Sequence, residues 1–183
     1  MHKSTVETTN PIAPSELIIS PEGRIYHLDL LPTDVADNII IVGDQERVER
    51  VSSFFDTIEV KISKREFVTH TGTIRGKRIT VLSTGIGCDN IDIVINELDA
   101  LVNINFATRL PNKEHRILNI IRLGTSGSLQ EDIPVDSFVM STFGLGFDGL
   151  LGFYDAKYDD IEIELKKEFL LQVKWNENIN TPY

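Results

Sequence analysis

Two segments of the chain place an arginine close to a glycine turn. In the first, Gly43 and Asp44 separate an apolar run from an amphipathic segment, and Arg47 follows three residues after Asp44. A glycine at such a turn lets the backbone approach a ligand closely, and the first turn of a helix offers unpaired N–H groups. A guanidinium in the same turn can bind the same anion through two parallel hydrogen bonds. The alternative is an ordinary strand–helix turn with a surface arginine.

The second segment begins at Arg122, which lies within an otherwise apolar run and precedes Gly124 and Thr125. An arginine in a buried strand is costly unless it is paired or bound to an anion. Anion binding and a structural ion pair with one of the many acidic residues therefore both remain open. Taken alone, Arg65 indicates a charge at the edge of a strand, and His27 indicates a surface or internally hydrogen-bonded histidine.

Strands, glycine turns and helices follow one another along the chain, and this order predicts an α/β fold. Continuous apolar runs that end in glycine predict buried strands, and apolar residues at spacings of three and four predict helices. The expected strands are residues 39–42, 57–62, 67–74, 78–83, 117–123 and 136–142, and the expected helices are residues 45–55, 90–102 and 161–175. Because such a sheet usually needs more strands to complete both faces, we expect a C-terminally truncated domain.

The composition is that of a soluble globular domain. The 183 residues are 41% apolar and 25% charged, with 18 Lys and Arg against 28 Asp and Glu, a net charge of −10. This charge argues against nucleic acid and membrane surfaces as partners, and the sequence has no apolar run long enough to span a membrane. One cysteine and four scattered histidines predict no disulfide, no metal site and a cytoplasmic protein. We expect a flexible N-terminal segment over residues 1–16 and a partial domain over residues 17–183.

Five motifs occur in an order that resembles the nucleoside phosphorylases, most closely the uridine phosphorylases. They are His27, Gly-Asp-x-x-Arg-Val (43–48), Arg-Glu-Phe (65–67), Ser-Thr-Gly-Ile-Gly (83–87) and Arg-Leu-Gly-Thr-Ser-Gly (122–127). The resemblance implies a three-layer mixed β-sheet flanked by helices. It also implies a pentosyltransferase of nucleoside salvage, which splits uridine or another nucleoside reversibly into free base and ribose 1-phosphate. Phosphate is then a co-substrate, and no cofactor is needed.

The resemblance further implies roles for individual residues. Phosphate binding falls to Gly43 through its backbone N–H, and to Arg47, Arg65, Arg122 and Thr125. Ribose contacts fall to Thr125 and to His27, which would hold the 5′-hydroxyl. In the family, the positions that match Arg65 and His27 reach into the neighbouring subunit's site, so a homodimer or a trimer of dimers is expected. No catalytic residue is assigned.

The sequence also departs from the family pattern. Gln45 replaces a usual proline, and the family's Gln-Gly-Arg and Met-Glu motifs, for the base and the ribose hydroxyls, fall beyond residue 183. The chain as given therefore predicts a phosphate half-site without a base site, and purine or pyrimidine preference stays open. One alternative is a catalytically incomplete remnant that binds phosphate or dimerises. Another is nucleoside hydrolysis by water, against which the arginine cluster argues.

Overall fold

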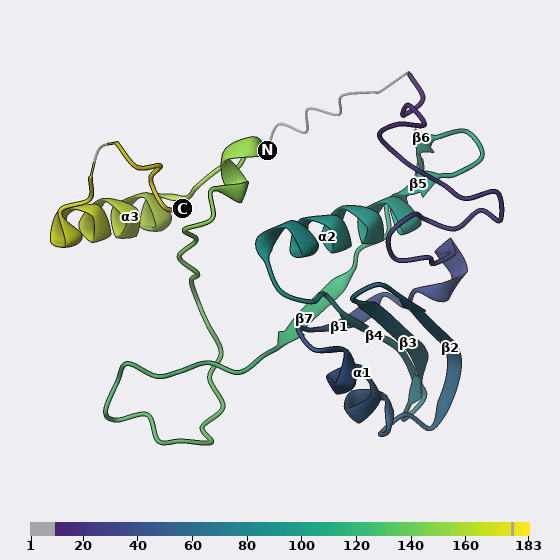
Figure 1. Cartoon of the computed structure of the whole chain (residues 1–183), viewed down its shortest axis with the longest axis horizontal. Helices are drawn as coiled ribbons and strands as arrows, with labels where there is room; N and C mark the ends of the chain where they lie inside the picture. The colour runs from purple at the N-terminus through teal and green to yellow at the C-terminus, as the bar shows by residue number, and fades with distance from the viewer. Residues whose placement is uncertain (1–9, 177) are drawn as a thin grey trace. The chain divides into compact units, whose positions relative to one another are not determined.

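A mixed five-stranded sheet forms the centre of the N-terminal part of the chain (Figure 1). The computed structural model describes residues 10–176 and 178–183. Residues up to Thr125 belong to one compact unit, and Ser126–Tyr183 form a second. The sheet has the order β2-β3-β4-β1-β7. Its strands are β1 (Asn38–Val42), β2 (Thr57–Lys64), β3 (Phe67–Ile74), β4 (Lys77–Ser83) and β7 (Asn119–Leu123).

Three neighbouring strands of this sheet run parallel and end at the same edge. β1 pairs in parallel with β4 on one side and with β7 on the other, so Val42 lies opposite both Ser83 and Leu123. β2, β3 and β4 are joined as antiparallel hairpins. The residues that follow the three parallel strands are therefore brought together, which is where α/β sheets commonly bind ligands.

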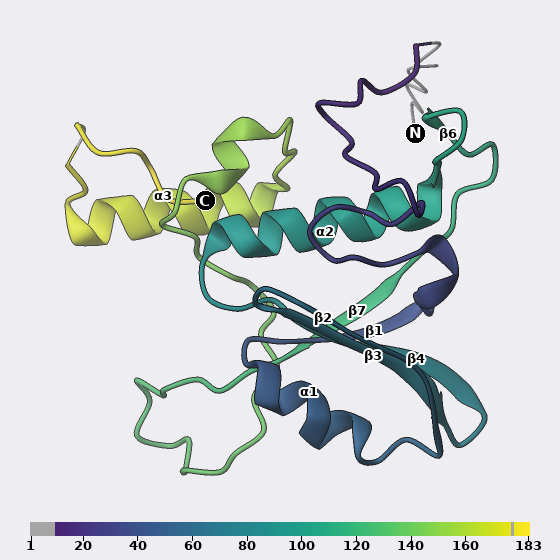
Figure 2. The same cartoon turned by 45° about the vertical axis from the view of Figure 1, so that its right-hand side comes forward.

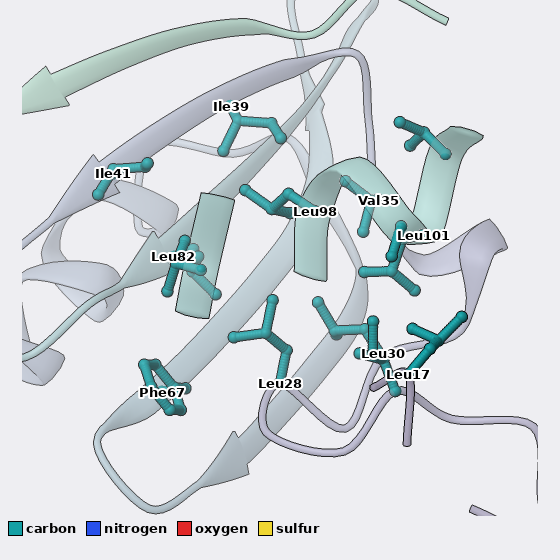
Figure 3. Packing of buried hydrophobic residues seen from close by; sticks show 14 residues of the cluster. Leu17, Leu28, Leu30, Val35, Ile39, Ile41, Phe67, Leu82, Leu98 and Leu101 are labelled. Atoms are coloured by element: carbon teal, nitrogen blue, oxygen red, sulfur yellow. The ribbon is translucent and has the colours of Figure 1, made fainter. Parts of the chain in front are cut away.

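Two helices cover opposite faces of the sheet, so the unit has the expected three layers (Figure 2). α1 (Gln45–Ser52) and α2 (Cys88–Asn103) follow β1 and β4 in the chain. Successive residues of β1 point to opposite faces: Ile41 packs in the cluster that contains Leu98 of α2, whereas Val42 packs with Val48 of α1. Figure 3 shows the larger of these two clusters.

Short elements complete the first unit. A 3₁₀ turn, η1 (Pro32–Asp34), precedes β1, and a small antiparallel pair, β5 (Ile104–Asn105) and β6 (Leu110–Pro111), follows α2. The predicted flexible segment falls partly on residues 1–9, which lie outside the described residues. Within its remainder, the Ile12 backbone N–H donates to the Arg109 carbonyl at 2.9 Å.

Most of the expected elements agree with the structure to within about two residues at each end, and two differ by more. α1 ends at Ser52 rather than at residue 55. The expected strand over residues 136–142 is not formed, and Phe138 and Met140 are fully or almost fully exposed. A strand is stable only when a neighbour pairs with its backbone groups, and β7 pairs only with β1 among the described residues. The alternation of apolar and polar residues over 136–142 is therefore not enough to predict a strand.

The second unit consists of loops, the 3₁₀ turn η2 (Leu150–Phe153) and the helix α3 (Asp160–Val173). The Asp159 carboxylate caps α3 by accepting a backbone N–H from the first turn at 2.8 Å. Phe147 lies against Phe169 and Trp175, with ring centroids 5.8 and 6.0 Å apart. These aromatic contacts hold the loop before η2 against the helix.

Candidate functional site

The turn between β1 and α1 provides a helix N-terminus at the edge where the parallel strands end. Asp44 has extended backbone dihedrals, and its carboxylate accepts the Glu46 backbone N–H at 3.0 Å, as a helix N-cap does. The Gln45 side-chain amide donates to the Arg65 carbonyl at 2.7 Å. The residue that stands in place of the family's proline thus ties the β2–β3 turn to the start of α1.

Gly43 faces the ends of both neighbouring strands. A Cβ atom placed on Gly43 would lie 3.8 Å from Nη2 of Arg122 and 3.9 Å from the carbonyl oxygen of Gly85. The Thr84 backbone N–H also donates to the Val42 carbonyl at 2.8 Å, which holds the end of β4 beside β1. The absence of a side chain at Gly43 therefore leaves a space bordered by a guanidinium and by the backbone after β4.

The guanidinium of Arg122 also lies at this edge. Arg122 is exposed on β7, and its side chain folds over Gly124, where a Cβ atom would come within 2.4 Å of Nη1. Its guanidinium makes no hydrogen bond or ion pair with any of the described residues. A buried ion pair, the structural alternative for this arginine, is thus not what the structure contains.

Arg47 also reaches the end of β7. It occupies the first turn of α1, and its Nη1 donates to the Leu123 carbonyl at 3.2 Å. No carboxylate within the described part of the chain forms an ion pair with it. By contrast, Arg24 pairs with Asp34 at 3.3 Å elsewhere in the same unit. In a chain with a net charge of −10, two arginines that reach the same sheet edge and have no acidic partner among the described residues form a locally positive site suited to an anion.

A second group of side chains surrounds the ring of Tyr26. Arg65 has a left-handed backbone (φ 55°) in the β2–β3 turn, and its guanidinium carbon lies 5.7 Å from the centre of that ring. The Lys64 ammonium lies 5.0 Å from the same centre. The rings of Tyr26 and His27 meet edge to face, 4.8 Å between centroids. Arg65 and His27, both predicted to serve a neighbouring subunit, are thus brought together around one aromatic ring.

His27 is held by a carboxylate from α2. The Nδ1 atom of His27 lies 2.7 Å from Oε1 of Glu97, and the same carboxylate accepts the backbone N–H groups of His27 and Leu28 at 3.0 and 2.9 Å. Glu97 is not among the predicted site residues, and it lies 70 residues from His27 in the chain. Its one local signal is its place between Val94 and Leu98, at the border of the buried stripe of α2.

Thr125 is the predicted site residue with the least structural support. It is exposed in the loop after β7, and its hydroxyl makes no hydrogen bond with the described residues. The structure thus joins Gly43, Arg47 and Arg122 in one group and Arg65 and His27 in another. The first group is linked to the Arg65 backbone through Gln45.

The described residues contain neither a cluster of metal ligands nor a helix suited to a membrane. Over residues 10–176 and 178–183, no group of three or more His, Cys, Asp or Glu side chains is placed to hold a metal ion. Within the same residues, none of the helices combines the length and apolar character that crossing a membrane requires.

Comparison with known proteins gives one consistent family. The sequence model of the protein family described as the phosphorylase superfamily matches residues 37–171 of this chain. Uridine phosphorylase of Thermococcus kodakarensis is 34% identical over 128 residues, covering 70% of this chain and 41% of that protein. The DeoD-type purine nucleoside phosphorylase of Clostridium perfringens is 32% identical over 116 residues, covering 63% of this chain and 44% of that protein. The chain thus spans less than half the length of these curated relatives.

A solved structure agrees with the sequence relatives. The crystal structure of a Trypanosoma brucei nucleoside phosphorylase, described as showing uridine phosphorylase activity, superposes with a TM-score of 0.71 and 30% identity. The match covers 85% of this chain and 53% of that one. The residues matched by the family model include Gly43, Arg47 and Arg122. The chain therefore belongs to the nucleoside phosphorylase family.

Proposed function

We propose that the chain acts in reversible phosphorolysis of uridine or another nucleoside, and that it supplies the phosphate-binding part of the site. The observation that carries this proposal is the meeting of Gly43, Arg47 and Arg122 at one sheet edge, with no carboxylate paired to either arginine. Arg65 and Thr125 would complete the phosphate site. The free base and ribose 1-phosphate would be the products, as in a pentosyltransferase of cytoplasmic nucleoside salvage.

The geometry suits the chemistry of this reaction. A phosphate oxygen attacks C1′ of the ribose while the bond from C1′ to the base nitrogen breaks, and the bonding electrons leave with the base. The ribose passes through a state with oxocarbenium character, so the enzyme must hold a dianion in line with the departing base. Two guanidinium groups that have no carboxylate partner among the described residues, together with a helix N-terminus, can hold a dianion through charge-assisted hydrogen bonds.

The second group of side chains would serve the ribose. His27 would bind the 5′-hydroxyl, and Thr125 would contact both ribose and phosphate. We propose that His27 and Arg65 act in the site of a neighbouring copy, in a homodimer or a trimer of dimers. Their common position around Tyr26 supports this idea, because one rigid aromatic ring would present both side chains together.

Ultraviolet monitoring of uridine cleavage by the 183-residue chain, with and without phosphate, tests the proposal. Release of uracil that depends on phosphate is the expected result, and inosine tests purine preference in the same assay. Release that is equally fast without phosphate would replace phosphorolysis by hydrolysis. No release from any nucleoside, with or without phosphate, would contradict the enzymatic activity for this chain.

The alternative is a phosphate-binding or dimer-forming module without catalysis. The observation behind it is that the two arginines provide an anion site at the sheet edge, whereas no residue of the described part of the chain has been assigned to the base. A thermal unfolding temperature that rises with phosphate, together with no nucleoside turnover, is the result expected of such a module. An unfolding temperature that does not respond to phosphate would contradict both functions.

A further inference from the structure

The hydrogen bonds around His27 determine which of its ring nitrogens carries the proton. A carboxylate only accepts hydrogen bonds, and Oε1 of Glu97 lies 2.7 Å from Nδ1 of His27. The proton of a neutral His27 ring must therefore be on Nδ1. The other nitrogen, Nε2, has no hydrogen-bond partner among the described residues and is then an acceptor.

The Glu97 carboxylate is itself held rigidly. It accepts the Leu28 backbone N–H at 2.9 Å through Oε2 and the His27 backbone N–H at 3.0 Å through Oε1. Its side chain is only 13% exposed, whereas that of His27 is 28% exposed. The buried member of the pair is thus the one with saturated hydrogen bonds, and the accessible member keeps one free nitrogen. This is how an outer carboxylate orients an imidazole toward a ligand.

We propose that Glu97 is a positioning residue that fixes His27 with Nε2 as an acceptor, so that this subsite selects a ligand that donates a hydroxyl proton. This inference rests on the proposed function, in which His27 binds the ribose 5′-hydroxyl. His27 and Glu97 line a cavity of about 270 Å³ together with Tyr26 and Asn96. A ribose with a free 5′-hydroxyl satisfies Nε2, whereas a 5-deoxyribose leaves it unpaired.

Glu97→Gln is the informative substitution. A glutamine can keep one oxygen on the backbone N–H groups only by turning its NH₂ toward Nδ1 of His27. That NH₂ donates a hydrogen bond to Nδ1, which can accept it only when Nδ1 carries no proton. The ring proton is then on Nε2, and the subsite changes from hydrogen-bond acceptor to hydrogen-bond donor. Glu59→Gln is the matched control, because it removes a carboxylate that pairs with Arg78 and touches no histidine.

Nitrogen-15 NMR of the histidine rings at pH 8 tests the positioning role without requiring catalysis. We expect His27, identified from a His27→Asn spectrum, to be protonated on Nδ1 in the unmodified chain and in Glu59→Gln. In Glu97→Gln the proton should move to Nε2. A His27 ring protonated on Nε2 in the unmodified chain, or one unaffected by Glu97→Gln, would overturn the inference.

Titration with three ligands separates this inference from the proposed function. Inorganic phosphate should shift the Gly43 amide signal, and no response there would contradict the proposed function itself. Ribose 1-phosphate should also shift Nε2 of His27 and bind roughly 2- to 12-fold more tightly than 5-deoxyribose 1-phosphate, the gain of one hydrogen bond. Glu97→Gln should abolish that preference. A phosphate response at Gly43 with equal affinity for both sugars would overturn the inference alone.

Discussion

Replacing Arg122 by glutamine should weaken phosphate binding without changing the stability of the free protein. The guanidinium of Arg122 forms no hydrogen bond or ion pair with the described residues, so its removal takes nothing from the folded state. We therefore expect the free energy of unfolding to change by less than about 0.5 kcal/mol. The effect of the substitution should be confined to the phosphate complex.

The loss of affinity follows from the hydrogen bonds that the guanidinium would make. A hydrogen bond to a charged group contributes about 1.5–3 kcal/mol, and about 1.4 kcal/mol corresponds to a tenfold change in affinity. Arg122→Gln should therefore weaken phosphate binding roughly 10- to 150-fold. Some of this change comes from the net charge of the whole chain, so a second arginine is needed for comparison.

Arg116→Gln is the matched control. Arg116 is also an exposed arginine, but its guanidinium forms an ion pair with Asp37. Its removal should lower the free energy of unfolding by up to about 1 kcal/mol, because an exposed ion pair is worth little. Phosphate affinity should fall much less than in Arg122→Gln, because only the change in net charge acts on it. The two variants lose the same charge, so they separate a local contact from a general electrostatic effect.

Isothermal titration calorimetry with phosphate at constant ionic strength measures the affinities, and urea unfolding measures the stabilities. Repeating the titration at higher salt reduces any long-range contribution of net charge. Equal losses of affinity in the two variants would refute the local site. A free energy of unfolding without phosphate that is lower in Arg122→Gln than in Arg116→Gln would also contradict the prediction.

Three further substitutions or conditions test the structure. Gly43→Ala should leave the free energy of unfolding nearly unchanged, since the new Cβ would lie 3.8 Å from Nη2 of Arg122. The same substitution should weaken phosphate binding measured by calorimetry, because the methyl group fills the space for the ligand. Thr69→Val should raise the free energy of unfolding in urea by about 1 kcal/mol, because the Thr69 hydroxyl is buried without a partner. Burial, and then the charge of Lys61, lower the pKa of His70 from its ordinary 6.5. The unfolded chain therefore binds this proton at a higher pH than the folded chain does. The contribution of His70 to the free energy of unfolding should be constant above pH 7 and should decrease as the pH drops below 6.5. Urea unfolding of His70→Asn should not show this decrease.

Most of the sheet could be predicted from the sequence because its signals are local. The apolar run that ends at Gly43 and the alternating segments between residues 57 and 83 specify strands whose partners are close in the chain. The meeting of Gly43 with Arg122 required only one further step. Gly43 directly follows β1 and Arg122 lies one residue before the end of β7, and parallel strands end at a common edge.

The parts that were missed depend on distant contacts. The contact between Glu97 and His27 joins residues that are 70 positions apart, and no spacing rule connects a loop histidine with a helix carboxylate. The strand expected over residues 136–142 was wrong for a different reason. The alternation of apolar and polar residues described a suitable strand but carried no information on whether a partner strand would lie beside it, and without that partner the segment is a loop.

The strand that carries Arg122 has the least packing support in the sheet. β1 has Ile39, Ile41 and Val42 buried, whereas all five residues of β7 are exposed, and β7 pairs only with β1 in the described part of the chain. The position of Arg122 therefore depends on the β1–β7 ladder and on the hydrogen bond from Arg47 to the Leu123 carbonyl. That bond gives Arg47 two effects, because it holds the end of the strand that carries Arg122 and also brings a second positive charge to the same sheet edge. Replacing Arg47 should therefore loosen the support of Arg122 as well as remove a charge, so the effects of substituting the two arginines on anion binding should not be additive.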